Sequence, residues 1–413
     1  MNGYQDVGTP GSAGGDVQRF IVAIVTAQFL AQIGAFTLPA LLPGYMVRWS
    51  LSATEAGWLI GAFFIAYVAT VPILVGLTDR LPARRIYVIG AGLTALSHLG
   101  FAALADGFWS ALVLRAIAGV GWAGCYMPGL KAIADRLEGN AQSRAVSWHA
   151  AGVGVSGAAS FAVAGAVDAI AGARAAFLFG AVAASLSCVI AAFAMRTTAP
   201  RRAGGAPLAG LLDFRPVLRN HPAMAWIAGY TVHTLELAVL RAWGVTFLAA
   251  VIQQHGAPEW LPEPSALFTG AGLLGIAASL SGNEAAVRLG RGRIVAIAMG
   301  SSALLALVTG LSALVSTPLA ILCVYAWNAA IYIDSSALTA GTVQAADPSR
   351  RGATMGLHSM CGYAGGFVGP IGVGVILDLA GADSAARWVL AFGYIVPVTL
   401  AGLYVLRRLG QRR

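Results

Sequence analysis

The loop at residues 79–86 reads DRLPARRI, and a similar loop at residues 287–294 reads VRLGRGRI. Each loop holds three arginines and joins two long apolar runs. The two loops start 208 residues apart, which is about half of the 413-residue chain. A second echo pairs Asp168, at the end of GAVD, with Asp378, at the end of VILD, at an offset of 210. Two matches at nearly one offset indicate that the chain consists of two related halves.

The apolar runs around these loops are long enough to cross a lipid bilayer. A helix needs about 20 apolar residues to span about 30 Å of hydrocarbon. Twelve such runs occur, six before and six after the polar segment 196–222. They occupy residues 20–42, 54–77, 86–104, 108–133, 145–170, 175–195, 223–251, 265–287, 293–315, 318–343, 353–379 and 385–406. The sequence therefore predicts an all-α membrane protein with 12 transmembrane helices in two pseudo-symmetric six-helix bundles.

The composition agrees with a membrane protein and excludes other classes. Hydrophobic residues make up 58% of the chain and charged residues only 10%, whereas soluble domains have about 25% charged residues. This excludes a soluble enzyme, a disordered regulator and a nucleic-acid-binding protein. The formal net charge of +9 has to be explained by where the basic residues lie.

The basic residues predict the orientation of the chain. All but five of the 26 Lys and Arg residues lie on one side of the predicted spans, and the five others are Arg48, Arg115, Arg174, Arg241 and Arg387. Because basic loops stay in the cytoplasm, we expect both termini there and a multi-pass protein of the bacterial cytoplasmic membrane. The predicted units are a cytoplasmic tail (1–19), an N-terminal bundle (20–195), a cytoplasmic central loop (196–222), a C-terminal bundle (223–406) and a basic tail (407–413).

The loop after the second run resembles a signature of the major facilitator superfamily. That signature reads Gly-x-x-x-Asp-Arg/Lys-x-Gly-x-Arg/Lys-Arg/Lys, and this chain supplies Asp79, Arg80, Arg84 and Arg85 at matching positions, with Val75 and Pro82 in place of the two glycines. Arg115-x-x-x-Gly119-x-Gly121 in the fourth run is a second pattern typical of the family. The resemblance covers the whole chain and implies the fold of that superfamily and secondary transport by alternating access.

The same resemblance implies a conformational latch at Asp79, Arg80, Arg84 and Arg85. These residues lie where two helices meet the cytoplasm, and a charge-assisted contact there can stabilise one conformation. The alternative is that the charges only set the orientation of the chain.

Ionisable residues within the predicted spans are candidates for function, because they are costly in a membrane unless they are paired or face water. They are Arg115 in the fourth span, His233, Glu236 and Arg241 in the seventh, and Asp334 in the tenth. The resemblance implies that helices one, four, seven and ten line a central cavity. The five ionisable residues lie on three of these helices.

A solute site is predicted along these spans. Arg115, Trp122 and Tyr126 share one helical stripe, which suits a planar or anionic ligand. The alternative is that Arg115 pairs with a carboxylate and Trp122 packs in the bundle. The residues expected to bind solute are Gln28, Gln32, Arg115, Trp122, Tyr126, Tyr230, His233, Arg241, Tyr325, Asn328, Tyr332 and Ser335.

Two carboxyl groups are candidates for proton coupling. Glu236 lies three residues after His233 on one helix, close enough to share a proton, and burial favours the protonated form of a carboxyl group. The alternative for Glu236 is a static ion pair, for example with Arg115. Asp334 lies off the polar stripe of the tenth span and is either a second proton site or a structural partner of a neighbouring helix.

We expect no enzyme activity, cofactor or metal site. The four cysteines lie far apart within apolar runs, and the chain has no HExxH, GxSxG or Walker pattern. We therefore expect a monomer that carries a small organic anion by proton-coupled symport, with the solute, protons and the lipid bilayer as its partners and no nucleic acid. The alternative is a proton-antiport exporter of drugs or metabolites.

Overall fold

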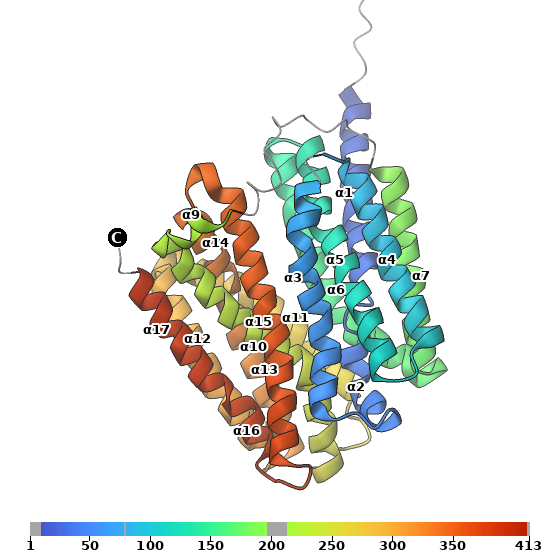
Figure 1. Cartoon of the computed structure of the whole chain (residues 1–413), viewed down its shortest axis with the longest axis vertical. Helices are drawn as coiled ribbons and strands as arrows, with labels where there is room; N and C mark the ends of the chain where they lie inside the picture. Colours follow the sequence, from blue (N-terminus) through green and yellow to red (C-terminus); the bar gives the residue numbers. More distant parts are fainter. Residues whose placement is uncertain (1–9, 78–79, 196–212, 411–413) are drawn as a thin grey trace, which may run out of the picture.

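The computed structural model describes residues 10–77, 80–195 and 213–410, and within these ranges the chain folds into helices (Figure 1). The helices of the N-terminal half are α1 (Pro10–Gln32), α2 (Thr37–Arg48), α3 (Ala53–Leu77), α4 (Ala83–Leu104), α5 (Phe108–Arg136), α6 (Gly139–Ala171) and α7 (Ala173–Ala194). Those of the C-terminal half are α9 (Arg215–Leu218), α10 (His221–His255), α11 (Pro264–Leu289), α12 (Arg291–Ser312), α13 (Thr317–Ile333), α14 (Ser335–Ala345), η1 (Pro348–Arg350), α15 (Arg351–Ala380), α16 (Arg387–Gly393) and α17 (Ile395–Gly410).

The predicted fold class and number of spans are confirmed, since 12 helical segments in the described part of the chain are long and apolar enough to cross a membrane. Their bounds differ from the predicted ones at the ends. Helix α1 begins at Pro10, within the predicted tail, and α17 continues to Gly410. The predicted central loop contains α9 and the start of α10. A helix ends where its backbone hydrogen bonds end, and polar residues continue it beyond the hydrocarbon.

Three of the spans are interrupted, which the sequence did not predict. The first breaks at residues 33–36 between α1 and α2, the tenth at Asp334 between α13 and α14, and the twelfth at Tyr394 between α16 and α17. Backbone groups freed in a membrane need a partner within the protein. At the first break, the Phe36 N–H donates a hydrogen bond to Ser160 Oγ of α6 at 3.0 Å. At this break, a neighbouring helix therefore replaces a lost backbone bond.

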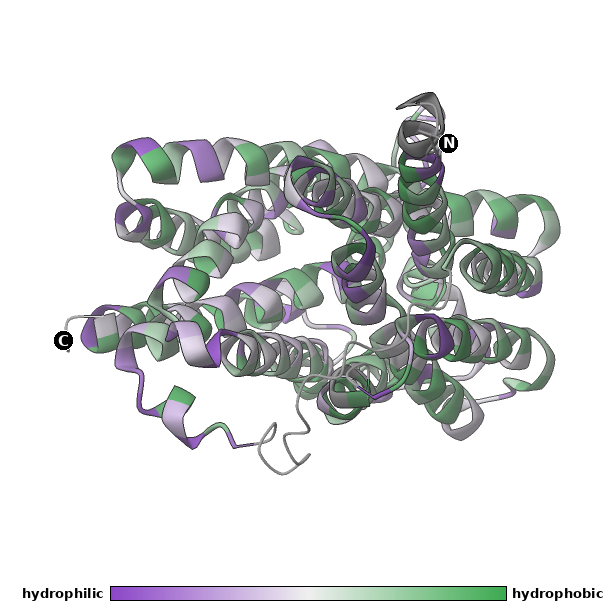
Figure 2. Ribbon diagram, turned by 90° about the horizontal axis from the view of Figure 1, so that it is seen from above, coloured by the Kyte–Doolittle hydropathy of each residue, from purple (hydrophilic) through white to green (hydrophobic). Residues whose placement is uncertain are grey.

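Large apolar side chains cover much of the outside of the molecule. Ile170, Phe193 and Leu379 each have more than 80% of their surface exposed. In Figure 2, hydrophobic residues, coloured green, occur along most of the helices. Such an apolar exterior suits contact with lipid chains and would be a liability in water. The fold therefore places an apolar surface where the predicted bilayer lies.

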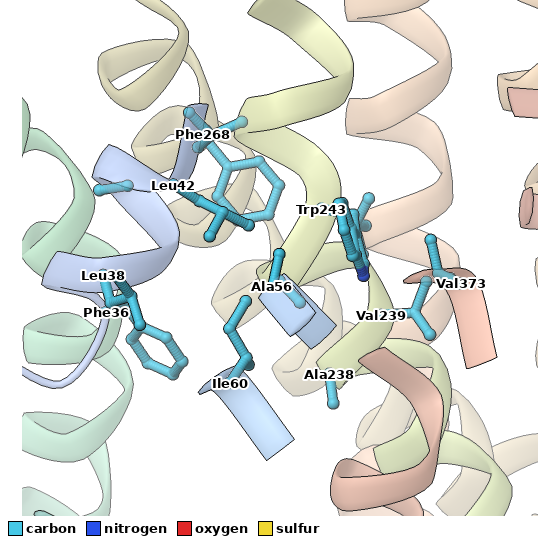
Figure 3. Packing of buried hydrophobic residues seen from close by; sticks show 14 of the residues in the cluster. Phe36, Leu38, Leu42, Ala56, Ile60, Ala238, Val239, Trp243, Phe268 and Val373 are labelled. Carbon is cyan, nitrogen blue, oxygen red and sulfur yellow. The ribbon is translucent and has the colours of Figure 1, made fainter. Parts of the chain in front are cut away.

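The two halves share one apolar core. Figure 3 shows side chains from both halves packed together, among them Phe36, Ile60, Trp243 and Phe268. Trp243 of α10 also donates an indole hydrogen bond to the Pro370 carbonyl of α15 at 2.9 Å. This core joins α2 and α3 of the N-terminal half to α10, α11 and α15 of the C-terminal half.

The two ends of the helix bundle differ, and we name them by their residues. The basic end holds the turn at residues 80–82 and the segment 346–350. The opposite end, here the Asp378 end, holds the loops 49–52 and 381–386 and lies at the bottom of Figure 1.

Candidate functional site

Arg115 lies inside the N-terminal half. Its side chain is 3% exposed, its Nε donates to the Leu59 carbonyl at 3.4 Å, and its guanidinium lies 4.8 Å from the centre of the Phe63 ring. Within the described part of the chain, no carboxylate forms an ion pair with it. The alternative pairing of Arg115 with a carboxylate is therefore not the observed arrangement there. Arg115 remains a buried cation that a bound anion can neutralise.

A small cavity lies beside Arg115. Gln32, Thr94, His98 and Trp122 are among the residues that line it with Arg115, and its volume of about 10 Å³ is near the lower limit for one water molecule. The Gln32 amide nitrogen is buried and has no hydrogen-bond partner among the described residues. The cavity thus combines a cation with a free amide donor and is too small, in this conformation, for an organic solute.

The two predicted glutamines take different positions. Gln32 lines the cavity, whereas Gln28, one turn earlier on α1, accepts a long hydrogen bond of 3.5 Å from the Tyr87 hydroxyl. Gln28 is therefore a neighbour of α4 in the helix bundle, and only Gln32 lies beside Arg115.

An aromatic cluster extends from Trp122 across the boundary between the halves. Trp122 lies 4.6 Å from Phe63 and 6.0 Å from Tyr363 of α15, measured between ring centres. Tyr67 lies 4.1 Å from Tyr363 in the same way. Sequence reasoning missed Phe63, Tyr67 and Tyr363 because it searched for polar and ionisable residues. Aromatic residues on the second and eleventh spans were the available signal.

Tyr126 packs against the same core as Trp122 and also faces α6. Its ring lies 5.6 Å from that of His149 on α6. His149 is fully buried, and neither ring nitrogen has a hydrogen-bond partner among the described residues. Of the predicted stripe, Trp122 and Tyr126 both pack in the shared core, and Tyr126 has the His149 ring as an additional neighbour.

Arg241 lies between the two halves. Its guanidinium donates to the Tyr332 hydroxyl at 2.5 Å and stacks over Phe36 of the N-terminal half, 4.9 Å from the ring centre. Both contacts orient a half-buried cation at the shared core. Arg241 is the second cation at this site, and it contacts residues from both halves.

His233 contacts Asp334. His233 Nδ1 lies 2.8 Å from Asp334 Oδ1, and both side chains are almost fully buried. Asp334 occupies the break between α13 and α14, so the pair joins α10 to an interrupted span. Interrupted helices form binding sites in many transporters.

Glu236 faces a different neighbour, and among the described residues no hydrogen bond joins it to His233. Its carboxylate accepts hydrogen bonds from Ser302 Oγ at 2.7 Å and from the Thr399 hydroxyl. Residues three apart on a helix share a face, but each packs against the helix nearest to it. His233 contacts Asp334, between α13 and α14, whereas Glu236 contacts α12 and α17. The alternative pair of Glu236 with Arg115 is also absent from the described ion pairs.

Tyr230 stacks between two histidines. Its ring centre lies 5.7 Å from that of His233 and 3.7 Å from that of His358 on α15. His358 Nδ1 lies 3.1 Å from the Thr342 hydroxyl of α14. His358 is not among the residues predicted from the sequence, although it continues the row that begins at Asp334.

Two of the remaining residues predicted on the tenth span bind the neighbouring helix α11. Tyr325 donates to the Leu267 carbonyl at 2.8 Å, and Asn328 donates to the Ala271 carbonyl at 2.5 Å, both on α11. Ser335 accepts a bond from Thr339 through its backbone carbonyl. Of the residues predicted on this span to bind solute, Tyr332 reaches the boundary between the halves through Arg241.

The predicted latch is described in part. Asp79 lies outside the described residues. Arg80 and Arg85 are exposed, and Arg84 lines a pocket at the basic end together with Asp135 and Arg136. None of these three arginines forms an ion pair with another described residue.

Comparisons with known proteins agree on one family. The profile of the Major Facilitator Superfamily matches residues 24–370. The uncharacterised MFS-type transporter YwoD of Bacillus subtilis (strain 168) is 28% identical over 118 residues, which cover 29% of this chain and 26% of YwoD. This match therefore spans about a quarter of that relative.

Two solved structures have a similar fold. The crystal structure of the nucleoside transporter NupG aligns with a TM-score of 0.74 at 15% identity and covers 95% of this chain and 100% of NupG. A bacterial homologue of the human lysosomal transporter Spinster, in an inward-facing and occupied conformation, aligns with a TM-score of 0.70 at 14% identity, covering 98% and 96% of the two chains. With the family match over most of its length, the chain belongs to the major facilitator superfamily and is a membrane transport protein, not an enzyme.

Proposed function

We propose that this transporter carries a small organic anion together with protons, by rocking of residues 20–195 against residues 223–406. The observation that carries the proposal is that Arg115 is buried without an ion pair among the described residues. A buried guanidinium without a counter-ion is unfavourable by several kcal/mol, and a carboxylate or phosphate group of a solute supplies that counter-ion. Arg115 can bind such a group through two parallel hydrogen bonds.

The second cation extends the proposed site toward the C-terminal half. Arg241 contacts Phe36 of one half and Tyr332 of the other. Rocking of the halves changes these contacts, so the binding of an anion near both arginines depends on the conformation. The aromatic cluster around Trp122 offers ring faces for the organic part of the solute.

The size of the cavity beside Arg115 supports a site that opens and closes. About 10 Å³ admits one water molecule at most. The first span is interrupted next to this cavity, at residues 33–36. We propose that movement of α1 relative to α2 enlarges the site when solute enters.

Proton coupling is proposed for the pair of His233 and Asp334, with Glu236 as a second carboxyl group. The pair is buried at a helix break. Asp334 is two residues from Tyr332, the partner of Arg241. Protonation of Asp334 removes its charge and weakens its contact with His233, which changes the packing of α10 against α13 and α14. Proton uptake and the position of Arg241 are thereby linked.

The alternative function is export of drugs or metabolites by proton antiport. The fold and the buried carboxyl groups are compatible with both symport and antiport. The direction of the proton-driven solute flux distinguishes these two functions. The proposed orientation, with both termini in the cytoplasm of a bacterium, rests on the basic loops.

The test is uptake by proteoliposomes that contain the purified protein. Labelled organic anions and cations are compared, with and without an inward proton gradient. For one proton per solute, one pH unit supports about tenfold accumulation. We expect anions alone to accumulate, and Asp334→Asn to abolish the effect of the gradient while counterflow persists. Asp383→Asn, in an exposed loop, is the matched control.

Two outcomes would contradict this proposal. Uptake that ignores the proton gradient in the wild-type protein rules out coupling. Solute efflux driven by the same inward gradient identifies an antiporter instead of a symporter.

A further inference from the structure

Asp378, near the end of α15, accepts two backbone hydrogen bonds from the other half of the molecule. Its Oδ1 accepts from the Ala53 N–H and its Oδ2 from the Thr54 N–H, both at 2.8 Å. These two groups are the first N–H groups of α3. A carboxylate at a helix N-terminus is favourable because it satisfies free donors and opposes the helix dipole. Asp378 thus caps a helix that lies more than 300 residues away in the sequence.

The start of α3 satisfies its other donors locally. The Ser52 hydroxyl accepts from the Glu55 N–H at 3.1 Å, and the Glu55 carboxylate accepts from the Ser52 N–H at 2.9 Å. This reciprocal arrangement is a capping box. It leaves the N–H groups of Ala53 and Thr54 without a local partner, and these are the two that Asp378 binds. The cap of α3 is complete only when both halves contribute.

Close packing of α3 against α15 puts Asp378 within reach. A Cβ atom at Gly57 would lie 2.6 Å from the Pro370 carbonyl oxygen, and one at Gly374 would overlap the Ala53 backbone. Pro370, Gly374 and Asp378 are spaced four residues apart and follow one side of α15. Small residues let the two backbones approach, and the carboxylate follows one turn later.

The other half of the repeat lacks this cap. Asp168 on α6 is the counterpart of Asp378 at the offset of 210 residues, and α11 is the counterpart of α3. Helix α11 begins with Pro264, which has no N–H to donate. Among the described residues, the Asp168 carboxylate makes no hydrogen bond, and Gly165 faces Ser265 instead.

We propose that Asp378 is an interdomain lock that holds the Asp378 end of the transporter closed. Separation of α15 from α3 breaks both hydrogen bonds at once and leaves two donors at the start of α3. Asp378 is exposed, so water can accept hydrogen bonds from these two N–H groups as the end opens. The lock therefore sets the balance between the closed and open states of this end, independently of which solute is carried.

The test measures the distance between the halves at this end. Spin labels are placed at Arg48→Cys and Asp383→Cys, both exposed, in the full chain with its four native cysteines replaced by alanine. A helix cap contributes about 0.5–2 kcal/mol, so removing it should raise the ratio of open to closed molecules about 2- to 30-fold. We expect this rise for Asp378→Ala and a smaller one for Asp378→Asn, which keeps one acceptor oxygen.

Asp168→Ala is the matched control, because it removes the counterpart that caps nothing in the described structure. Its distance distribution should equal that of the parent. Equal distributions for Asp378→Ala and the parent overturn the lock, as does an equal shift for Asp168→Ala. Size-exclusion and thermal unfolding profiles identify misfolded protein, and the conservative Asp378→Asn then carries the test. Because no solute or proton gradient is used, the result is separate from that of the uptake assay.

Discussion

At the scale of single residues, Arg115 is the side chain whose surroundings say most about function. Its nearest described partners are a backbone carbonyl and an aromatic ring. Neither neutralises its charge, and the adjacent cavity also exposes the free Gln32 amide. Both groups are donors, so the site is complementary to an acceptor-rich ligand.

Substitution of Arg115 tests this complementarity. In Arg115→Gln the cation is lost, and we expect KM for the anionic solute to rise about 10- to 100-fold, as for the loss of a hydrogen bond to a charged group. Arg115→Lys should restore part of the affinity, because charge remains and the planar fork is lost. Uptake kinetics in proteoliposomes provide the measurement.

Arg174→Gln is the control for this substitution. Arg174 is exposed and donates to the Ala102 carbonyl at 2.8 Å. An unchanged KM in Arg115→Gln, or an equal rise in Arg174→Gln, would show that Arg115 does not bind solute.

At the scale of helices, the seam between α3 and α15 depends on residues without side chains. Gly57 faces the Pro370 carbonyl and Ile371 at distances that leave no room for a methyl group. A Cβ atom added at Gly300, on α12, would meet open space instead. The same chemical change therefore has opposite expected effects at the two positions.

Gly57→Ala should destabilise the protein by about 1–3 kcal/mol, because the added methyl group forces the helices apart. Gly300→Ala should be neutral or stabilise by up to about 1 kcal/mol, since alanine favours helix. Thermal unfolding in detergent compares the two variants. Equal unfolding temperatures would mean that the seam adapts easily and does not position Asp378.

Helix existence was predictable from sequence, whereas helix partners were not. Apolar length alone identifies the 12 spans. The break at residues 33–36 depends on Ser160, a residue over 100 positions away that accepts the Phe36 N–H. Likewise, helical periodicity put Glu236 near His233 but could not show that Ser302 and Thr399 bind it. The site residues could be predicted from their chemistry. Their partners could not, because these depend on how the helices pack.

At the scale of the whole molecule, the charge distribution predicts which end faces the cytoplasm. Ser349 is exposed at the basic end, and Asp383 is exposed at the Asp378 end. The positive-inside rule places the first inside the cell and the second outside.

Single cysteines at these positions test the orientation. With a membrane-impermeant thiol reagent, Asp383→Cys should react in intact cells, and Ser349→Cys should react only after the membrane is opened. The native cysteines are replaced beforehand in both proteins. The reverse labelling pattern would invert the proposed topology.

The apolar core shared by the two halves has a thermal consequence. Opening the Asp378 end parts surfaces that include Phe36, Ile60 and Phe268 and lets water reach them. Hydration of apolar surface raises heat capacity by about 0.45 cal/mol/K for each Å². The enthalpy of the conformational change therefore depends on temperature, and a plot of the logarithm of its equilibrium constant against inverse temperature is curved.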